Sequence, residues 1–232
     1  MNIASITQTL HLVAILAIPL LLAITLHEAS HGWIASKLGD NTALMLGRVS
    51  ANPLKHIDLI GTIIVPILIA SISPFIFGWA KPVPVNWTNL KNPKRDMALV
   101  AIAGPASNLV MALGWALIAK ACYIMLKGQV SLNPNTTQTV FGLCFLSAYF
   151  GIVINFVLMV LNLIPIPPLD GSRVGASFLS PPWSRWYEKI EPYGFFILLG
   201  LLFLGHLQFI LIKPVMLLTT TVTQGLGTPP LM

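Results

Sequence analysis

Five apolar stretches alternate with short polar connections along the 232-residue chain. They run at about 8–36, 57–79, 96–127, 139–164 and 194–222. Each stretch approaches or exceeds the roughly 20 residues that a helix needs to cross a bilayer. The pattern therefore predicts an all-α polytopic membrane protein.

The stretch 57–79 differs from the other four because Pro66 and Pro74 interrupt it and basic residues flank both of its ends. Lys37, Arg48 and Lys55 precede it, and Lys81, Lys91, Lys94 and Arg95 follow it. Since cytoplasmic loops collect Lys and Arg, both ends are predicted to lie in the cytoplasm. We therefore predict about four transmembrane helices plus one re-entrant segment, in the inner membrane, with an extracytoplasmic N-terminus.

A shorter apolar run lies between the first two stretches, from Ala43 to Ser50, and Gly47 interrupts it. It is too short to span a membrane, and it predicts a short β-hairpin at the membrane surface. An edge at 43–51, or an extended backbone over 163–169, could hold another extended polypeptide segment by strand addition.

Composition supports a membrane protein. Hydrophobic residues make up 56% of the chain and charged residues 9%, whereas a soluble domain carries about 25% charged residues. The formal charge is +6, but the basic residues lie in the connections between apolar stretches. This distribution indicates membrane orientation and no nucleic-acid partner. We expect one membrane-embedded domain over 1–232, with its core at about 8–175 and a C-terminal helix at about 194–222.

Ionisable residues occur inside the first apolar stretch. His27 and His31 are four residues apart, so a helix places both imidazoles on one face, where they could bind one Zn²⁺. Glu28 lies beside them as a possible general base. Ionisable groups inside a membrane segment indicate a functional site by default.

A zinc hydrolase needs a third protein ligand, and the chain has seven acidic residues. Asp170 stands out among them because it closes the run from Asn162, which contains three prolines. Those prolines cannot continue a helix, so the helix is predicted to break where Asp170 offers its carboxylate. An aspartate in an Asp-Gly turn with Gly171 is the competing interpretation.

Together these residues resemble the site-2 protease family of intramembrane zinc metalloproteases. The matching elements are His27–His31, Ala103–Asn108, Asn162–Gly171 and the run from Phe77 to Asn86. The resemblance implies one Zn²⁺ per chain, bound by His27, His31 and Asp170, with Glu28 activating water.

The resemblance also implies roles for two amides. Asn162 matches a residue that contacts substrate or its oxyanion, and Asn108 matches many members, although an interhelical hydrogen bond would also explain it. His56 is a further possible oxyanion donor, with an interfacial position beside Lys55 as the alternative.

The implied function is hydrolysis of peptide bonds within or near transmembrane segments of membrane proteins. Release of membrane-tethered regulators and clearance of signal peptides are tasks of this kind. The expected partners are transmembrane substrates and the lipid bilayer, and the predicted topology implies an active site toward the cytoplasm. Two alternatives remain: an inactive membrane scaffold, which should have lost a ligand or the base, and a metal transporter, which should carry ligands along a path.

Overall fold

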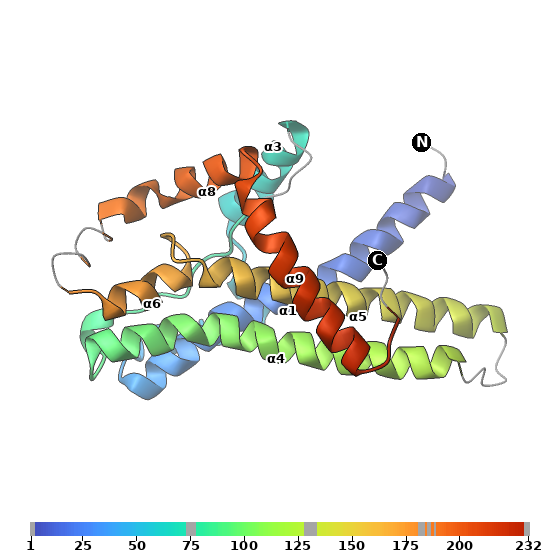
Figure 1. The fold of residues 1–232 in the computed structure, drawn as a ribbon, viewed down its shortest axis with the longest axis horizontal. Coiled ribbons are helices and arrows are strands. Elements are labelled where there is room, and N and C mark those ends of the chain that lie inside the picture. The colour runs from blue at the N-terminus through green and yellow to red at the C-terminus, as the bar shows by residue number, and fades with distance from the viewer. Residues whose placement is uncertain are drawn as a thin grey trace.

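The structure is a computed structural model, and it describes residues 3–72, 78–127, 134–180, 184, 187 and 189–229. The longest helices are α1 (Ile3–Leu38), α4 (Pro93–Lys127), α5 (Pro134–Leu163) and α9 (His206–Gly225). The shorter helices are α2 (Thr42–Met45), η1 (Pro53–Lys55), η2 (Leu59–Ile64), α3 (Val65–Ile72), η3 (Trp87–Asn89), α6 (Asp170–Phe178), η4 (Glu191–Tyr193) and α8 (Gly194–Phe203). Figure 1 shows their arrangement.

Within the described residues, four helices are long and apolar enough to cross a membrane. They are Ile15–Leu38, Pro93–Lys127, Val140–Leu163 and His206–Gly225. This result confirms the prediction of a multi-pass, helical membrane protein with four such helices.

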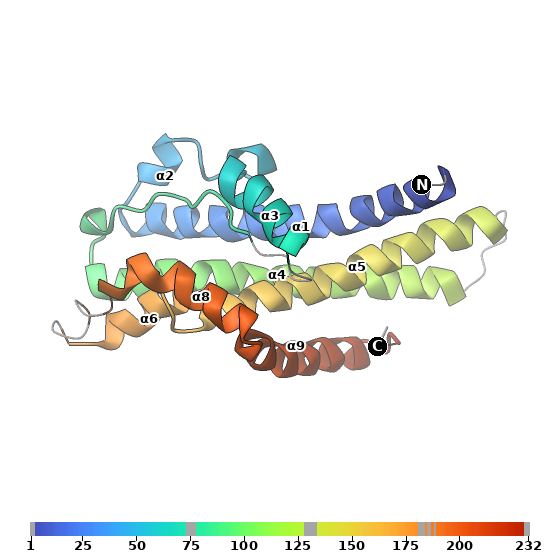
Figure 2. The same cartoon turned by 90° about the horizontal axis from the view of Figure 1, so that it is seen from above.

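An antiparallel pair, α4 and α5, forms the centre of the molecule (Figures 1 and 2). Three alanines of α4, Ala112, Ala116 and Ala119, are fully buried against Ile152 and Phe156 of α5. Small side chains let membrane helices approach closely, so this stripe explains the tight pairing. Helix α1 packs against both partners and brings its ionisable residues to them.

The two ends of segment 57–79 lie next to each other. The N–H of Trp79 donates to the Gly61 carbonyl at 3.0 Å, and the N–H of Lys81 donates to the His56 carbonyl at 2.9 Å. Helix α3 has eight residues, which gives it a length of about 12 Å. Because the hydrocarbon core is about 30 Å thick, α3 is too short to cross it.

The predicted β-hairpin at 43–50 is wrong. Helix α2 occupies Thr42–Met45, and no strand occurs in the described part of the chain. The buried carboxylate of Asp40 accepts hydrogen bonds from the N–H and the hydroxyl of Thr42 and so starts the helix. Gly47, with φ of +63°, ends the turn that follows. A substrate-binding edge at 43–51 therefore loses its basis.

The backbone at 163–169 also differs from the expected extended form. The helix break itself is confirmed, because α5 ends at Leu163 and α6 begins at Asp170. Between them the chain forms tight turns, with the Ile166 N–H donating to the Ile164 carbonyl and the Leu169 N–H donating to the Ile166 carbonyl. These turns leave little straight backbone for strand addition.

The predicted C-terminal helix at 194–222 is two helices. Gly205 has φ of +75° and separates α8 from α9. An L residue rarely adopts this left-handed conformation, so glycine permits the bend. Apolar composition alone does not mark such a break, and only α9 is long enough to span.

Candidate metal centre

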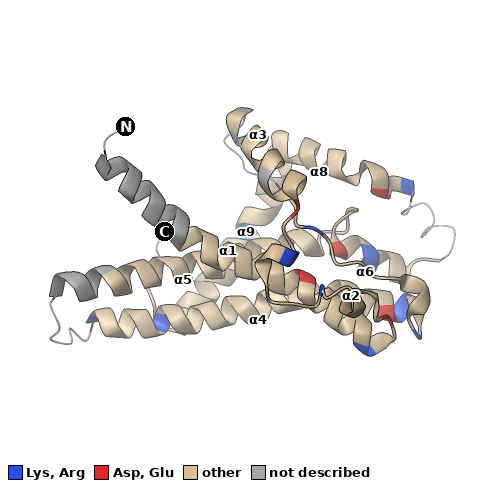
Figure 3. Ribbon diagram, turned by 180° about the vertical axis from the view of Figure 1, so that it is seen from behind, with Lys and Arg blue, Asp and Glu red and all other residues tan. Residues whose placement is uncertain are grey.

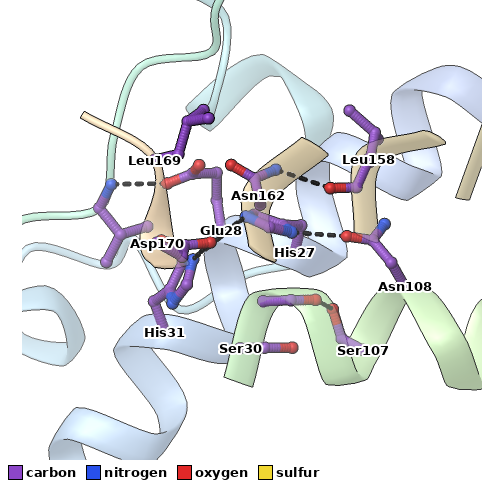
Figure 4. Close-up of polar contacts among 12 residues, drawn as sticks. His27, Glu28, Ser30, His31, Ser107, Asn108, Leu158, Asn162, Leu169 and Asp170 are labelled. Carbon is purple, nitrogen blue, oxygen red and sulfur yellow. Dashed lines mark hydrogen bonds and ion pairs between the residues drawn. The ribbon is translucent and has the colours of Figure 1, made fainter. Parts of the chain in front are cut away.

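Two histidines of α1 and one aspartate of α6 meet beside the α4–α5 pair (Figure 4). The Oδ2 atom of Asp170 lies 3.2 Å from Nε2 of His27 and 3.4 Å from Nε2 of His31. Both imidazoles are buried, with exposed fractions of 6% and 8%. The helical spacing of four residues aligns the two rings, and the break before α6 delivers the carboxylate.

The outer ring nitrogens fix the tautomers of the two histidines. Nδ1 of His31 lies 2.7 Å from the Val100 carbonyl, which can only accept, so Nδ1 carries the proton. Nδ1 of His27 lies 2.6 Å from Oδ1 of Asn108 and donates to it in the same way. Both Nε2 atoms therefore present lone pairs to the centre.

This arrangement fits a cation. The two Nε2 atoms lie 3.2 Å apart, and the buried Oδ2 of Asp170 has no hydrogen-bond partner among the described residues. Three electron-pair donors within 4.8 Å of one another repel unless a positive charge lies between them. Two imidazole nitrogens and one carboxylate oxygen are a ligand set that zinc uses in hydrolases, with a fourth position open.

Gly104 makes room for the two rings against α4. A Cβ at this position would lie 2.5 Å from Cε1 of His27 and 2.5 Å from Nε2 of His31. Real Cβ contacts are not this short, so only glycine is compatible with this approach. The Ala103–Asn108 motif thus supplies both a glycine below the rings and an amide behind one of them.

Glu28 lies on α1 beside the ligand cluster (Figure 4). Its Oε2 accepts a hydrogen bond from the backbone N–H of Val83 at 2.9 Å. Val83 belongs to segment Lys81–Asn86, whose N–H groups also bond to His56 and Asp40. The carboxylate is therefore held at one oxygen, which leaves the other oxygen for a substrate or water.

The remaining predicted site residues have different surroundings. Nδ2 of Asn162 donates to the Leu158 carbonyl at 3.0 Å, and in Figure 4 its amide oxygen points toward Glu28. Asn108 lies behind His27, which favours orientation of a ligand over a contact with substrate. His56 is buried and contacts Ser50 and Lys81 at the base of segment 57–79.

Three groups at the site carry no signal that sequence reasoning used. The Val100 carbonyl and the Val83 N–H are backbone groups, which a sequence pattern does not reveal. Asn155 is fully buried on α5 and accepts a hydrogen bond from Nδ2 of Asn108 at 2.9 Å. A polar residue in the middle of an apolar span is a signal that could have pointed to it.

Comparisons with known proteins agree with this geometry. The model of Peptidase family M50 matches residues 15–204. YwhC of Bacillus subtilis, named as a candidate zinc metalloprotease, is 38% identical over 193 residues, which cover 83% of this chain and 81% of YwhC. Rip2 of Mycolicibacterium smegmatis, with a name of the same kind, is 30% identical over 185 residues, 78% of this chain and 64% of Rip2.

Rip2 of Mycobacterium tuberculosis (strain H37Rv) is 24% identical over 181 residues. No solved structure matches the chain with comparable significance. The family model covers most of the chain, including both histidines, the aspartate and the glycine that accommodates them. The chain therefore belongs to Peptidase family M50, the site-2 protease family of intramembrane zinc metalloproteases that its sequence resembles.

Proposed function

We propose that this protein hydrolyses peptide bonds within or near transmembrane segments of other membrane proteins, with His27, His31 and Asp170 binding one Zn²⁺ and Glu28 as the general base. The convergence of two Nε2 lone pairs and one carboxylate oxygen at a buried point carries this proposal. Glu28 lies next to the point where a water molecule would have to be deprotonated.

Each residue of the site has a separate proposed role in the reaction. A zinc ion held by His27, His31 and Asp170 would lower the pKa of water to about 7 and would polarise the scissile carbonyl. Glu28 takes a proton from the attacking water with its free oxygen and returns it to the leaving amine. Asn162 lies on the same side of the site as Glu28 and is our proposed contact for the substrate; to donate to the developing oxyanion, its Nδ2 would have to turn away from the Leu158 carbonyl.

The position of the ligands on membrane helices defines the substrate class. His27 and His31 lie within the apolar helix Ile15–Leu38, so a scissile bond must reach the membrane to meet them. Peptide bonds of a transmembrane helix are shielded by its hydrogen bonds, so a substrate has to unwind locally before Glu28 can act.

Zinc content and cleavage of a transmembrane reporter test this function. Purified wild type should hold one zinc per chain and cut the reporter. Glu28→Gln should keep zinc and lose cleavage, whereas Asp170→Ala should lose or weaken zinc binding. Glu191→Gln is the matched control, because Glu191 pairs with Arg173 and with none of the proposed ligands, so this variant should retain both properties.

The same variants separate the two alternatives. A scaffold would be insensitive to Glu28→Gln, and a metal transporter would change its ion flux. Metal-free wild-type protein, or cleavage that survives Glu28→Gln, would contradict a protease site at these residues.

We also propose that segment 57–79 is re-entrant and that the site lies near the cytoplasmic side. The hydrogen bonds that join its two ends support this topology. Charged residues also gather at the end of the molecule where α4 begins and α2 and α6 lie (Figure 3), as expected for a cytoplasmic face. A topology reporter inserted at Asn89 should score cytoplasmic, and an extracytoplasmic result would exclude this orientation.

A further inference from the structure

A chain of hydrogen bonds leads from the metal centre into the core between α4 and α5. His27 donates from Nδ1 to Oδ1 of Asn108 at 2.6 Å. Asn108 donates from Nδ2 to Oδ1 of Asn155 at 2.9 Å. Asn155 donates from Nδ2 to the Gly151 carbonyl, one turn earlier on α5, at 2.8 Å. All four groups are buried, and both asparagines are fully enclosed.

The direction of this chain is fixed at its far end. A backbone carbonyl can only accept, so Asn155 must turn its Nδ2 toward Gly151 and its Oδ1 toward Asn108. Asn108 must then present Nδ2 to Asn155, which leaves its Oδ1 for His27. The Ala23 carbonyl, 3.5 Å from Nδ2 of Asn108, favours the same orientation.

The orientation of Asn108 decides which nitrogen of His27 is available to a metal. With Oδ1 toward the ring, the proton sits on Nδ1 and the Nε2 lone pair faces Asp170. If the Asn108 amide were reversed, its Nδ2 would donate to Nδ1 of His27, which would then have to carry a lone pair. The ring proton of His27 would move to Nε2, inside the ligand cluster. That tautomer cannot bind zinc through Nε2.

We propose that Asn155 is a positioning residue for the metal: it holds the amide of Asn108 in one orientation and thereby selects the zinc-binding tautomer of His27. Asn155 touches neither substrate nor metal ligand and acts through Asn108. The inference rests on the proposed zinc site. It goes further in assigning a role to a residue of α5 that lies behind that site.

Zinc affinity, measured by competition with a chelator on purified full-length protein, tests the proposal. Asn155→Leu removes the amide group and keeps a side chain of similar size. Outer partners of metal-bound histidines typically change affinity by about 10-fold to 100-fold, and we expect a loss of at least the lower value. Asn155→Ala provides the same test if the leucine variant does not fold.

Ser147→Ala is the matched control. Ser147 is also on α5 and its hydroxyl donates to the Ile15 carbonyl at 2.9 Å, but it does not contact Asn108 in the described structure. Its zinc affinity should remain that of wild type. Equal losses in the Asn155 and Ser147 variants would indicate a general effect of removing polar groups from α5 and would overturn the proposal.

A double variant distinguishes orientation from packing. Both oxygens of a carboxylate accept, so Asn108→Asp needs no partner to face His27 correctly. Asn108→Asp combined with Asn155→Leu should therefore regain most of the zinc affinity that Asn155→Leu alone loses. A double variant as weak as Asn155→Leu would mean that residue 155 acts through packing, which contradicts the proposal.

Wild-type affinity in Asn155→Leu would also overturn the role of Asn155 while leaving the zinc site in place. Failure of the wild type itself to bind zinc would instead contradict the proposed function. The two failures are therefore distinguishable in one titration series.

Discussion

Gly104 illustrates how a single residue defines the space around the proposed zinc ligands. The rings of His27 and His31 lie so close to α4 that an added Cβ would meet both at 2.5 Å. Gly114 lies on the same helix, but a Cβ there would have no heavy atom within 4 Å. The two glycines differ only in what faces them, and they form a natural pair for comparison.

We expect Gly104→Ala to displace the histidine rings and to weaken zinc binding by at least about tenfold, a loss typical of disturbed ligand geometry. Gly114→Ala should retain both zinc and cleavage, because alanine is the better helix former and meets nothing. Chelator competition and reporter cleavage on both proteins provide the measurement. Normal zinc affinity in Gly104→Ala would show that the rings do not need this space.

Some of the residues at this site were predictable from the sequence and others were not. Helical spacing predicted that His27 and His31 share one face, and three prolines predicted the break before Asp170. The donors and acceptors behind the ligands were not predictable in the same way, because the Val100 carbonyl and Val83 N–H have no side-chain signature. The role of Asn155 is visible only in the structure, because its hydrogen bond to Asn108 depends on how α5 packs against α4.

At the scale of elements, segment Lys81–Asn86 connects the base of segment 57–79 to the proposed active site. Its N–H groups bond in turn to the His56 carbonyl, Glu28 and Asp40. Pro82 and Pro84, which lack an N–H, alternate with the bonded positions and keep the backbone extended. The segment therefore positions the Glu28 carboxylate from outside α1.

Removal of the Val83 N–H should reduce catalysis without loss of metal. A hydrogen bond to a charged group is worth about 1.5–3 kcal/mol, so Val83→Pro should lower cleavage by roughly 10-fold to 100-fold. Zinc content should stay at the wild-type level. Val83→Ala keeps the N–H and is the control for the side chain; an equal loss in both variants would rule out the N–H as the important group.

Asp40 helps to explain why the 43–50 run begins with the short helix α2 (Thr42–Met45) and continues in turns rather than forming the predicted hairpin. Its buried carboxylate accepts hydrogen bonds from Thr42 and from Asn86 and Asn89, residues more than 40 positions away. Burial alone would raise the pKa of Asp40, but these hydrogen bonds outweigh it and hold the pKa below its usual value. A local hydrophobic pattern cannot report such distant partners.

The lowered pKa has a defined effect on stability. A carboxylate with a depressed folded-state pKa stabilises the fold above its unfolded pKa of about 3.9, and that contribution is lost as the pH falls through the folded pKa. We expect Asp40→Asn to lower the melting temperature at neutral pH and its difference from wild type to shrink below about pH 4.

Melting curves in detergent across this pH range would measure the effect. Glu191→Gln is the control, since the ion pair that Glu191 forms with Arg173 is partly exposed, at 42% and 32% of the two side chains, and should contribute less than the fully buried Asp40. A difference between Asp40→Asn and wild type that did not change with pH would contradict the assignment to the ionised carboxylate.

At the scale of the whole molecule, α8 and α9 together return the chain to the face where α4 ends. A Cβ at Gly227, just beyond α9, would lie 3.6 Å from Nζ of Lys120, which is near the end of α4. Since α4 begins beside the proposed cytoplasmic site, the end of α9 should be extracytoplasmic. The sequence predicted the apolar stretch at 194–222. It did not predict the bend at Gly205, which separates the short helix α8 from α9, the helix that is long enough to span.

A topology reporter inserted at Thr228 should therefore score extracytoplasmic, opposite to the one at Asn89. The pair of insertions tests the direction of the C-terminal helices independently of the protease chemistry. Cytoplasmic scores for both positions would mean that α9 does not complete a crossing.

Gly194 places the start of α8 directly on the turn that leads to Asp170. A Cβ at Gly194 would lie 1.9 Å from the Pro167 carbonyl oxygen. The next residue, Phe195, packs its ring edge-on against Trp79, whose N–H donates a hydrogen bond to the Gly61 carbonyl. Helix α8 thus touches both the loop that carries one proposed zinc ligand and the base of segment 57–79. We therefore expect a displacement of α8 within the bilayer to move both the loop before Asp170 and the base of segment 57–79, which would couple the surrounding lipid to a proposed zinc ligand.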